Sequence, residues 1–331
     1  MSRPADPAGP AGQAGRADSA GDARPIGVFD SGIGGLTVMR AVASRLPEER
    51  LIYLGDTARV PYGTKSAATV SRYSRQCAGF LRQRGIKALV VACNTASALA
   101  MDDLRALMAP HAIPVLGVIE PGAVEACRVS RFGRVGVIGT ASTIRSDAYA
   151  RAIGAIKPDF TVFSAACPLF VPLAEEGWND ADDPVARTVA MRYLEPLRIA
   201  GVDTVILGCT HYPLLRGVIE GVLPGVALVD SGAAVTADLA RALARLGIAS
   251  RVGAAGSGAY TPGGAEARPD TAPAATRRAE YYVTDDPERF RTVGVRFLGH
   301  DIEGPHLAEL TRDDTTASGE SADRGERVDR G

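Results

Sequence analysis

Two stretches far apart in the chain repeat one design: an apolar strand, a cysteine, two polar residues and a helix. The first runs from Leu89 to Ala98 and the second from Thr204 to Leu215. A short apolar run that ends in small polar residues is typical of a buried parallel strand leading into a helix. Cys93 and Cys209 are therefore expected at the carboxyl ends of strands, where open α/β sheets bind their ligands.

A second pair of similar stretches precedes the first pair. Ile26 to Ser31 resembles Val135 to Thr140, and each lies at a comparable distance ahead of its cysteine. Matched order and spacing predict two half-molecules, each with one cysteine at the rim of its sheet. The predicted fold class is α/β, with two similar doubly wound parallel-sheet domains related by pseudo-twofold symmetry and an active site in the cleft between them.

Composition narrows the possible partners and the compartment. The 331 residues suffice for two domains, and a formal net charge of −1 gives no reason to expect nucleic acid or a membrane surface as a partner. No apolar run approaches the roughly 20 residues that span a bilayer. The odd number of cysteines, without metal-ligand spacing or a signal peptide, favours a reduced cytoplasm and no metal site. These cysteines are Cys77, Cys93, Cys127, Cys167 and Cys209.

Two further loops belong to the same predicted rim. Ser31 to Gly35 forms a tight turn into a helix, but its glycine spacing departs from the dinucleotide-binding fingerprint, so we favour carboxylate binding or simple turn geometry. Gly55 to Ser66 is a long loop marked by glycine and proline, where functional residues commonly gather. A helix-capping turn is the structural alternative for this second loop.

Two cysteines that face one cleft can perform a specific reaction. One thiolate takes a proton from one face of a carbon and one thiol returns a proton to the other face, which is racemisation without a cofactor. An ordinary thiol has a pKa of about 8.5, and a helix N-terminus or a protonated histidine lowers it. The polar pairs Asn94-Thr95 and Thr210-His211 are suited to bind the substrate carboxylate.

Most free cysteines are small buried hydrophobic residues, and Cys77, Cys127 and Cys167 keep that interpretation. His211 is a candidate proton partner of Cys209, with a capping or structural role as the alternative. Asp30 could assist Cys93, with an Asx turn as the alternative.

Four motifs occur in order along the chain. They are Val-Phe-Asp-Ser-Gly-Ile-Gly-Gly-Leu-Thr-Val (28–38), Gly-Asp-Thr-Ala-Arg-Val-Pro-Tyr-Gly-Thr-Lys-Ser (55–66), Ala-Cys-Asn-Thr-Ala-Ser-Ala (92–98) and Gly-Cys-Thr-His-Tyr-Pro-Leu-Leu (208–215). These motifs resemble those of the glutamate racemases, within the aspartate/glutamate racemase superfamily. The similarity covers about residues 25–250 and 279–300. It implies cofactor-independent interconversion of L- and D-glutamate, which supplies D-glutamate for peptidoglycan.

The resemblance also implies roles for individual residues. Cys93 and Cys209 are the two acid/base thiols, with Asp30 and His211 as their respective partners. Glu175 or Glu176 is expected to assist near His211, and we take Glu175 as the candidate. A homodimer is expected, with glutamate as the small-molecule substrate and no cofactor, metal, nucleic acid or membrane. The glutamate site is lined by Asp30, Ser31, Pro61, Tyr62, Gly63, Asn94, Thr95, Thr210 and His211.

The family fold implies that the last ordered segment returns to the first domain, and composition marks the tails. Strand-like signals resume at Ala279 to Thr284 and at Val295 to Leu298. The predicted division is a disordered tail at 1–24, a first domain at 25–119 plus 233–304 with a disordered insertion at 253–276, a second domain at 120–232, and a disordered tail at 305–331.

Three alternatives to glutamate racemisation remain open at this point. An aspartate racemase, or another superfamily member acting on a carboxylate, would turn over D-aspartate comparably with glutamate. A non-catalytic carboxylate-binding protein would lose no turnover when Cys93 is replaced by serine. A pyridoxal-dependent racemase needs a Schiff-base lysine, and Lys65 is the only lysine near the proposed rim.

Overall fold

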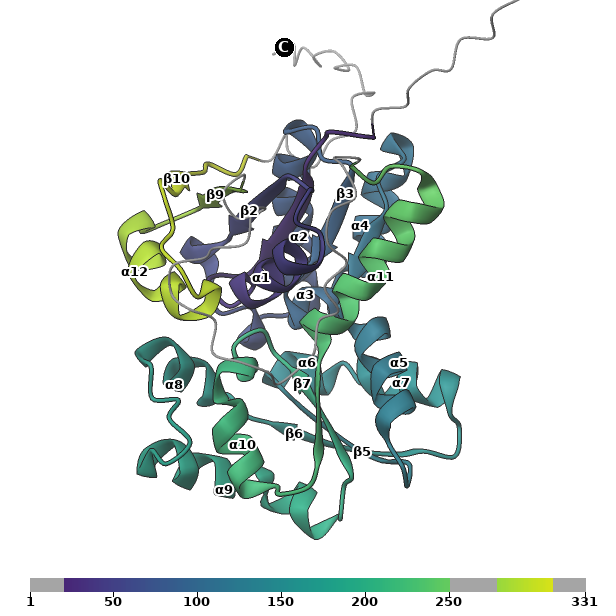
Figure 1. Ribbon diagram of the computed structural model, residues 1–331, viewed down its shortest axis with the longest axis vertical. Helices are drawn as coiled ribbons and strands as arrows, with labels where there is room; N and C mark the ends of the chain where they lie inside the picture. Colours follow the sequence, from purple (N-terminus) through teal and green to yellow (C-terminus); the bar gives the residue numbers. More distant parts are fainter. Residues whose placement is uncertain (1–20, 251–278, 312–331) are drawn as a thin grey trace, which may run out of the picture.

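The computed structural model describes residues 21–250 and 279–311, which form two parallel β-sheets flanked by helices (Figure 1). The six-stranded sheet has the order β10-β9-β2-β1-β3-β4 and the four-stranded sheet the order β6-β5-β7-β8. The strands are β1 (Ile26–Asp30), β2 (Leu51–Gly55), β3 (Ala88–Val91), β4 (Val115–Gly117), β5 (Arg134–Gly139), β6 (Thr161–Ala166), β7 (Thr204–Gly208), β8 (Ala227–Asp230), β9 (Ala279–Val283) and β10 (His306–Leu307).

The two sheets share a topology. The order β2-β1-β3-β4 in the first sheet matches β6-β5-β7-β8 in the second, and the neighbouring strands in both are parallel. This agreement confirms the predicted α/β class with two parallel sheets. The two cysteines follow equivalent strands. Cys93 follows β3, which pairs with β1, and Cys209 follows β7, which pairs with β5.

Helices cover both faces of the six-stranded sheet, because alternate residues of its buried strands point to opposite sides. Ile26 and Val28 of β1 pack into the same core as α1 and α11, whereas Phe29 packs into the core that holds α2 and α4. The helices are α1 (Leu36–Arg45), α2 (Ala67–Gln83), α3 (Asn94–Leu99), α4 (Met101–Met108), α5 (Ile119–Val129), α6 (Ala141–Arg145), α7 (Ala148–Ile156), α8 (Phe170–Glu176), α9 (Pro184–Ile199), α10 (Arg216–Val222), α11 (Ser231–Leu246) and α12 (Pro287–Leu298).

Short 3-10 turns lie in several of the connections. They are η1 (Thr57–Arg59), η2 (Tyr62–Thr64), η3 (Ala109–His111) and η4 (Tyr212–Leu215). Two of them lie at the rim predicted from the sequence. The turn η2 lies in the loop after β2, and η4 follows Cys209. No helix within 21–250 or 279–311 combines the length and the apolar character that a bilayer crossing requires.

The strand-like signal at Val295 to Leu298 is wrong, because this stretch is the last turn of α12. The helix has strong boundary signals: Asp286 caps its start by accepting a hydrogen bond from the Arg289 amide, Pro287 is its first residue, and Gly299 follows its end at a φ of 87°. Phe290, Val293 and Phe297 are buried on one face, at the spacing of an amphipathic helix.

The predicted C-terminal tail begins too early. Residues 306–307 form β10, which pairs in parallel with β9, and Ala308 after it is buried. At the other end, the predicted tail at 1–24 overlaps the described residues. The backbone carbonyl of Asp22 accepts a hydrogen bond from Lys87 Nζ at 2.6 Å. The predicted insertion at 253–276, the first twenty residues and the chain after 311 lie outside the described residues.

Candidate active site

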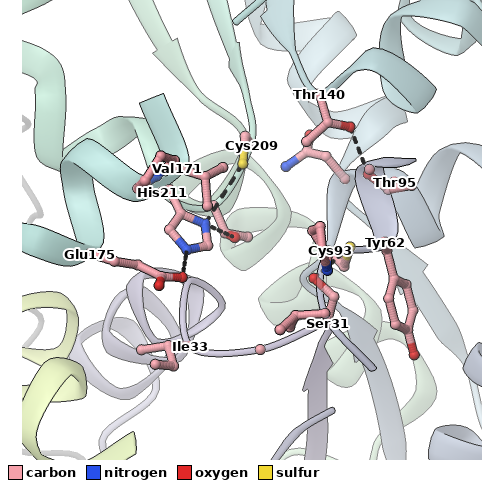
Figure 2. A pocket seen from close by; sticks show the side chains of 17 residues that line it. Ser31, Ile33, Tyr62, Cys93, Thr95, Thr140, Val171, Glu175, Cys209 and His211 are labelled. Atoms are coloured by element: carbon pink, nitrogen blue, oxygen red, sulfur yellow. Dashed lines mark hydrogen bonds and ion pairs between the residues drawn. The ribbon is translucent and has the colours of Figure 1, made fainter. Parts of the chain in front are cut away.

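The carboxyl ends of the two sheets meet at one cavity of about 230 Å³ (Figure 2). This is smaller than the roughly 300–1,000 Å³ of sites that hold drug-sized ligands, so it suits a small metabolite. Its lining comes from both sheets. The lining residues are Ser31, Gly32, Ile33, Val60, Pro61, Tyr62, Gly63, Cys93, Asn94, Thr95, Thr140, Val171, Pro172, Glu175, Cys209, Thr210 and His211.

Cys93 caps the start of α3, which begins at Asn94. Its Sγ accepts a hydrogen bond from the Ala96 amide at 3.5 Å and donates one to Ser31 Oγ at 3.6 Å. Burial, followed by the negative charge of Asp30, raises the pKa of Cys93 to about 12, although the Ala96 and Ser31 contacts act in the opposite direction. Cys93 is therefore a neutral thiol at pH 7.

Cys209 has a different set of neighbours. Its Sγ lies 3.8 Å from His211 Nδ1, and His211 Nε2 lies 3.0 Å from Glu175 Oε1. Burial lowers the pKa of His211, but the contacts with Cys209 and Glu175 outweigh this and raise it to about 10. The His211 imidazole is therefore protonated at pH 7, and a positive charge beside a sulfur stabilises a thiolate there.

Glu175 is the carboxylate that reaches His211, and the neighbouring Glu176 is exposed. The hydrogen bond from His211 lowers the pKa of Glu175, and a second hydrogen bond from Arg289 acts in the same direction against the effect of burial. Of the two glutamates that the sequence left as candidates, the geometry therefore favours Glu175 over Glu176. Figure 2 shows Cys209, His211 and Glu175 in a line along one wall of the cavity.

Asp30 is fully buried behind the cavity rather than part of its lining. Its Oδ2 accepts a hydrogen bond from the Gly32 amide at 3.0 Å, and its Oδ1 accepts one from Thr210 Oγ1 at 3.5 Å. Burial raises the pKa of Asp30, opposed by the charge of His211 and by backbone amides. The Asx turn and the influence on Cys93 therefore occur together, with no hydrogen bond between Asp30 and Cys93 among the described contacts.

Hydrogen-bond donors for a carboxylate gather beside Cys93. Asn94 Oδ1 accepts from the Tyr149 hydroxyl at 2.7 Å, while its buried Nδ2 has no partner among the described residues. Thr95 Oγ1 lies 2.9 Å from Thr140 Oγ1 on the opposite sheet. An unpaired buried amide is costly, so a ligand that accepts from Asn94 Nδ2 gains affinity.

Tyr62 lines the cavity, but its hydroxyl is engaged elsewhere. The hydroxyl donates to Asp56 Oδ2 at 2.5 Å and points away from the two cysteines (Figure 2). Asp56 also accepts hydrogen bonds from Arg59 at 2.7 Å and from Thr284 at 2.9 Å. This buried network fixes the loop that presents Pro61 and Gly63 to the cavity.

Two glycines permit close approach between the two sheets. A Cβ on Gly34 would collide with the His211 ring and with Thr210 Oγ1, and a Cβ on Gly63 would collide with the Thr140 side chain. Glycine is required at these positions because each loop lies directly against the facing one.

All of the predicted site residues except Asp30 line the cavity, and Asp30 lies behind it. Six lining residues were not among the predicted site residues: Gly32, Ile33, Val60, Thr140, Val171 and Pro172. Thr140 follows β5 at the position that Ser31 occupies after β1, so the internal repeat carried the signal for it. None of the three lysines lines the cavity, which therefore offers no side-chain amine for a Schiff base.

The chain is similar to known proteins over most of its length. Residues 26–239 match the Asp/Glu/Hydantoin racemase family, and the chain belongs to it. A curated glutamate racemase from Geobacter metallireducens is 53% identical over 277 residues, covering 83% of this chain and 93% of that protein. The resemblance inferred from the four motifs is confirmed.

Solved structures of glutamate racemases share the fold. The enzyme from Francisella tularensis in complex with D-glutamate matches with a TM-score of 0.74 and 37% identity, covering 87% of this chain and 98% of that one. The Escherichia coli enzyme in complex with L-glutamate and an activator matches with a TM-score of 0.62 and 30% identity, covering 83% and 95%.

Proposed function

We propose that this chain interconverts L- and D-glutamate by proton transfer between the substrate Cα and two thiols, without a cofactor. The observation that carries the proposal is the arrangement of Cys93 and Cys209. They come from equivalent positions of two sheets, and both line one small cavity. The relatives described above act on glutamate. In the family, the D-glutamate that the reaction forms is used for peptidoglycan.

The two thiols start the reaction in different protonation states. With His211 protonated beside it, Cys209 acts as the thiolate, while Cys93 holds its proton. Cys209 Sγ takes the Cα proton, and the electron pair left on Cα forms a carbanion. Cys93 then gives its own proton to the opposite face of Cα. Cys209 ends as the thiol and Cys93 as the thiolate, and the reverse reaction exchanges these roles.

Proton transfer by positioned groups supplies only part of the rate enhancement. General acid–base catalysis contributes roughly 10²–10⁴-fold, so the site must also stabilise the carbanion. Donors placed to bind the substrate carboxylates are Asn94 Nδ2, the hydroxyls of Ser31 and Thr95, and Thr210. Asp30 keeps Thr210 and the Gly32 turn in place. A substrate that displaces water from the cavity strengthens these contacts.

The state of assembly and the cellular location belong to the same proposal. We expect a homodimer, as the family resemblance implies, and a cytoplasmic protein, as the reduced cysteines favour. Sedimentation of the purified full chain tests the first expectation. A monomer at all concentrations would contradict it without affecting the chemistry proposed for the cavity.

The test of the proposed function replaces each thiol in turn. Cys93→Ser and Cys209→Ser should each lower racemisation by at least roughly 10²-fold, because serine is a far weaker acid and base. Cys127→Ser on α5 is the matched control, since this buried cysteine lies outside the cavity, and it should keep the wild-type rate. Full racemisation by either of the first two variants would overturn the two-thiol proposal.

Substrate choice is tested on the same protein. D-glutamate and D-aspartate are compared as substrates by circular dichroism without added cofactor. We expect turnover of glutamate to exceed that of aspartate, because the shorter substrate cannot hold Cα between the thiols and reach the same donors. Comparable turnover of the two would favour an aspartate racemase.

A further inference from the structure

Helix α12 belongs to the six-stranded sheet but contacts the partners of Cys209, which belong to the four-stranded sheet. It follows β9 in the chain and packs on α1, and its other side meets α8, which carries Glu175. Figure 1 shows α12 and α8 side by side where the two halves meet. The group that assists Cys209 is therefore held from the opposite half of the molecule.

Arg289 of α12 contacts the Glu175 carboxylate directly. Arg289 Nη2 donates to Glu175 Oε2 at 3.2 Å, while the other oxygen, Oε1, lies 3.0 Å from His211 Nε2. One carboxylate thus bridges a guanidinium and an imidazolium. Because the two oxygens share one rigid plane, fixing Oε2 also fixes the direction in which Oε1 meets His211.

Two neighbours of Arg289 on α12 support the same arrangement. Arg296 donates a hydrogen bond to the backbone carbonyl of Glu175, and the ring of Phe297 lies edge-on to the His211 ring with 5.2 Å between centroids. The helix therefore holds the backbone of Glu175 and one side of His211. Arg289 makes the third contact of this helix, and it is the one made to the Glu175 carboxylate.

Among the residues that the structure describes, Cys93 has no equivalent of this arrangement. Its contacts, Ser31 Oγ and the Ala96 amide, come from its own sheet and the helix that follows it. The two halves thus repeat their strands but differ in how their thiols are supported. A change in α12 should consequently affect proton transfer at one thiol and leave the other thiol's contacts intact.

We infer that Arg289 is a positioning residue for proton transfer at Cys209, acting through Glu175 and His211. The inference rests on the proposed function, since it assigns Arg289 a role in the two-thiol reaction. Arg289 touches neither thiol, and its side chain is 53% exposed. Its expected effect is therefore modest, and removing it should lower kcat by about 2–5-fold.

A double-mutant cycle on the full chain tests the inference. Arg289→Ala, Glu175→Gln and the double variant are compared with the wild type. If Arg289 acts through Glu175, then Arg289→Ala lowers kcat in the wild type but has little further effect once Glu175 is glutamine. Arg289→Lys keeps a cation near Oε2 and should restore part of the loss. Arg291→Ala, which removes an exposed arginine from the same helix, is the control and should keep the wild-type kcat.

An isotope measurement separates positioning from general damage to the structure. L- and D-glutamate with deuterium at Cα each deliver it to a different thiol. The ratio of the two isotope effects on kcat/KM therefore reports which transfer limits the rate. Arg289→Ala should move this ratio in the same direction as Glu175→Gln. General damage would lower the rates and leave the ratio at its value in Arg291→Ala.

The outcomes distinguish this inference from the proposed function. Additive losses in the cycle, or an Arg289→Ala variant that behaves like Arg291→Ala, would overturn the role of Arg289 alone. If Cys93→Ser or Cys209→Ser kept full racemisation, the two-thiol function itself would fail. If Glu175→Gln kept full racemisation, the failure would lie with the role of Glu175.

Discussion

At the scale of single residues, the two thiols are stabilised by different chemistry. Cys93 is a buried thiol at the start of a helix, and Cys209 is paired with an imidazole that is itself paired with Glu175. In the proposed reaction, this difference fits Cys93 as the first proton donor and Cys209 as the first proton acceptor. A symmetric pair of cysteines with equal surroundings would not distinguish these roles.

The raised pKa of His211 predicts a pH-dependent contribution to stability. Its folded-state pKa of about 10 exceeds the ordinary value of about 6.5, so the protonated imidazole stabilises the fold fully below pH 6.5 and loses this effect as the pH rises through 10. Tm measured from pH 6 to 10 should fall more steeply for the wild type than for His211→Asn. The exposed His111→Asn is the control, and equal slopes for wild type and His211→Asn would contradict the prediction.

At the scale of the elements, function depends on loops that follow strands of one sheet and press against the other. The turn from β1 into α1 carries Gly34 against His211, and the η2 turn carries Gly63 against Thr140. These loops were predictable from sequence because glycine-rich turns after apolar strands are local signals. The partner each one meets was not predictable, since it depends on how the two sheets face each other.

Gly34→Ala tests the close approach at His211. The added methyl group must displace His211 or Thr210, and a shift of about 1 Å in a positioned group can cost roughly 10²-fold in rate. Gly154→Ala in α7 is the matched control, because its Cβ would meet nothing within 4 Å. That substitution should keep the racemisation rate and stabilise the helix by about 0.5–1 kcal/mol. A wild-type rate for Gly34→Ala would contradict the observed contact.

The helix α12 shows where sequence patterns were insufficient. Val295 to Leu298 has the composition of a strand, and the boundary signals at Asp286 and Gly299 decided the outcome instead. Thr140 was recognisable from the internal repeat, but Arg289 was not. Its significance depends on a contact with Glu175 that spans more than a hundred residues of chain.

At the scale of the whole molecule, the cavity lies at the carboxyl edge of the sheets and a buried ion pair lies at the opposite edge. Lys87, just before β3, is paired with Glu49 at 2.5 Å, and both side chains are almost completely buried. Lys87 Nζ also donates to the carbonyl of Ile248 at 2.8 Å, which ties the end of α11 to the six-stranded sheet. The proposed domain boundaries, at 119/120 and 232/233, are consistent with this contact and stay a prediction.

Lys87→Met tests the separation between stability and catalysis. Removing one partner leaves Glu49 buried without its cation, which should cost about 3–5 kcal/mol of unfolding free energy. Because the pair lies at the far edge of the sheet, kcat of the folded variant should stay at the wild-type value. Lys157→Met, at an exposed position, is the control for loss of a lysine and should leave both quantities unchanged. A lowered kcat for folded Lys87→Met would contradict the separation.

The most direct measurement follows the Cα hydrogen during a single conversion. Protiated L-glutamate is incubated with the wild-type chain in D₂O without added cofactor and stopped while little product has formed. If one sulfur removes the proton and the other supplies a new one, the D-glutamate carries solvent deuterium at Cα while the recovered L-glutamate keeps its protium. D-glutamate that retains the original protium would show that a single group moves the proton, and the account of two opposed thiols would be wrong.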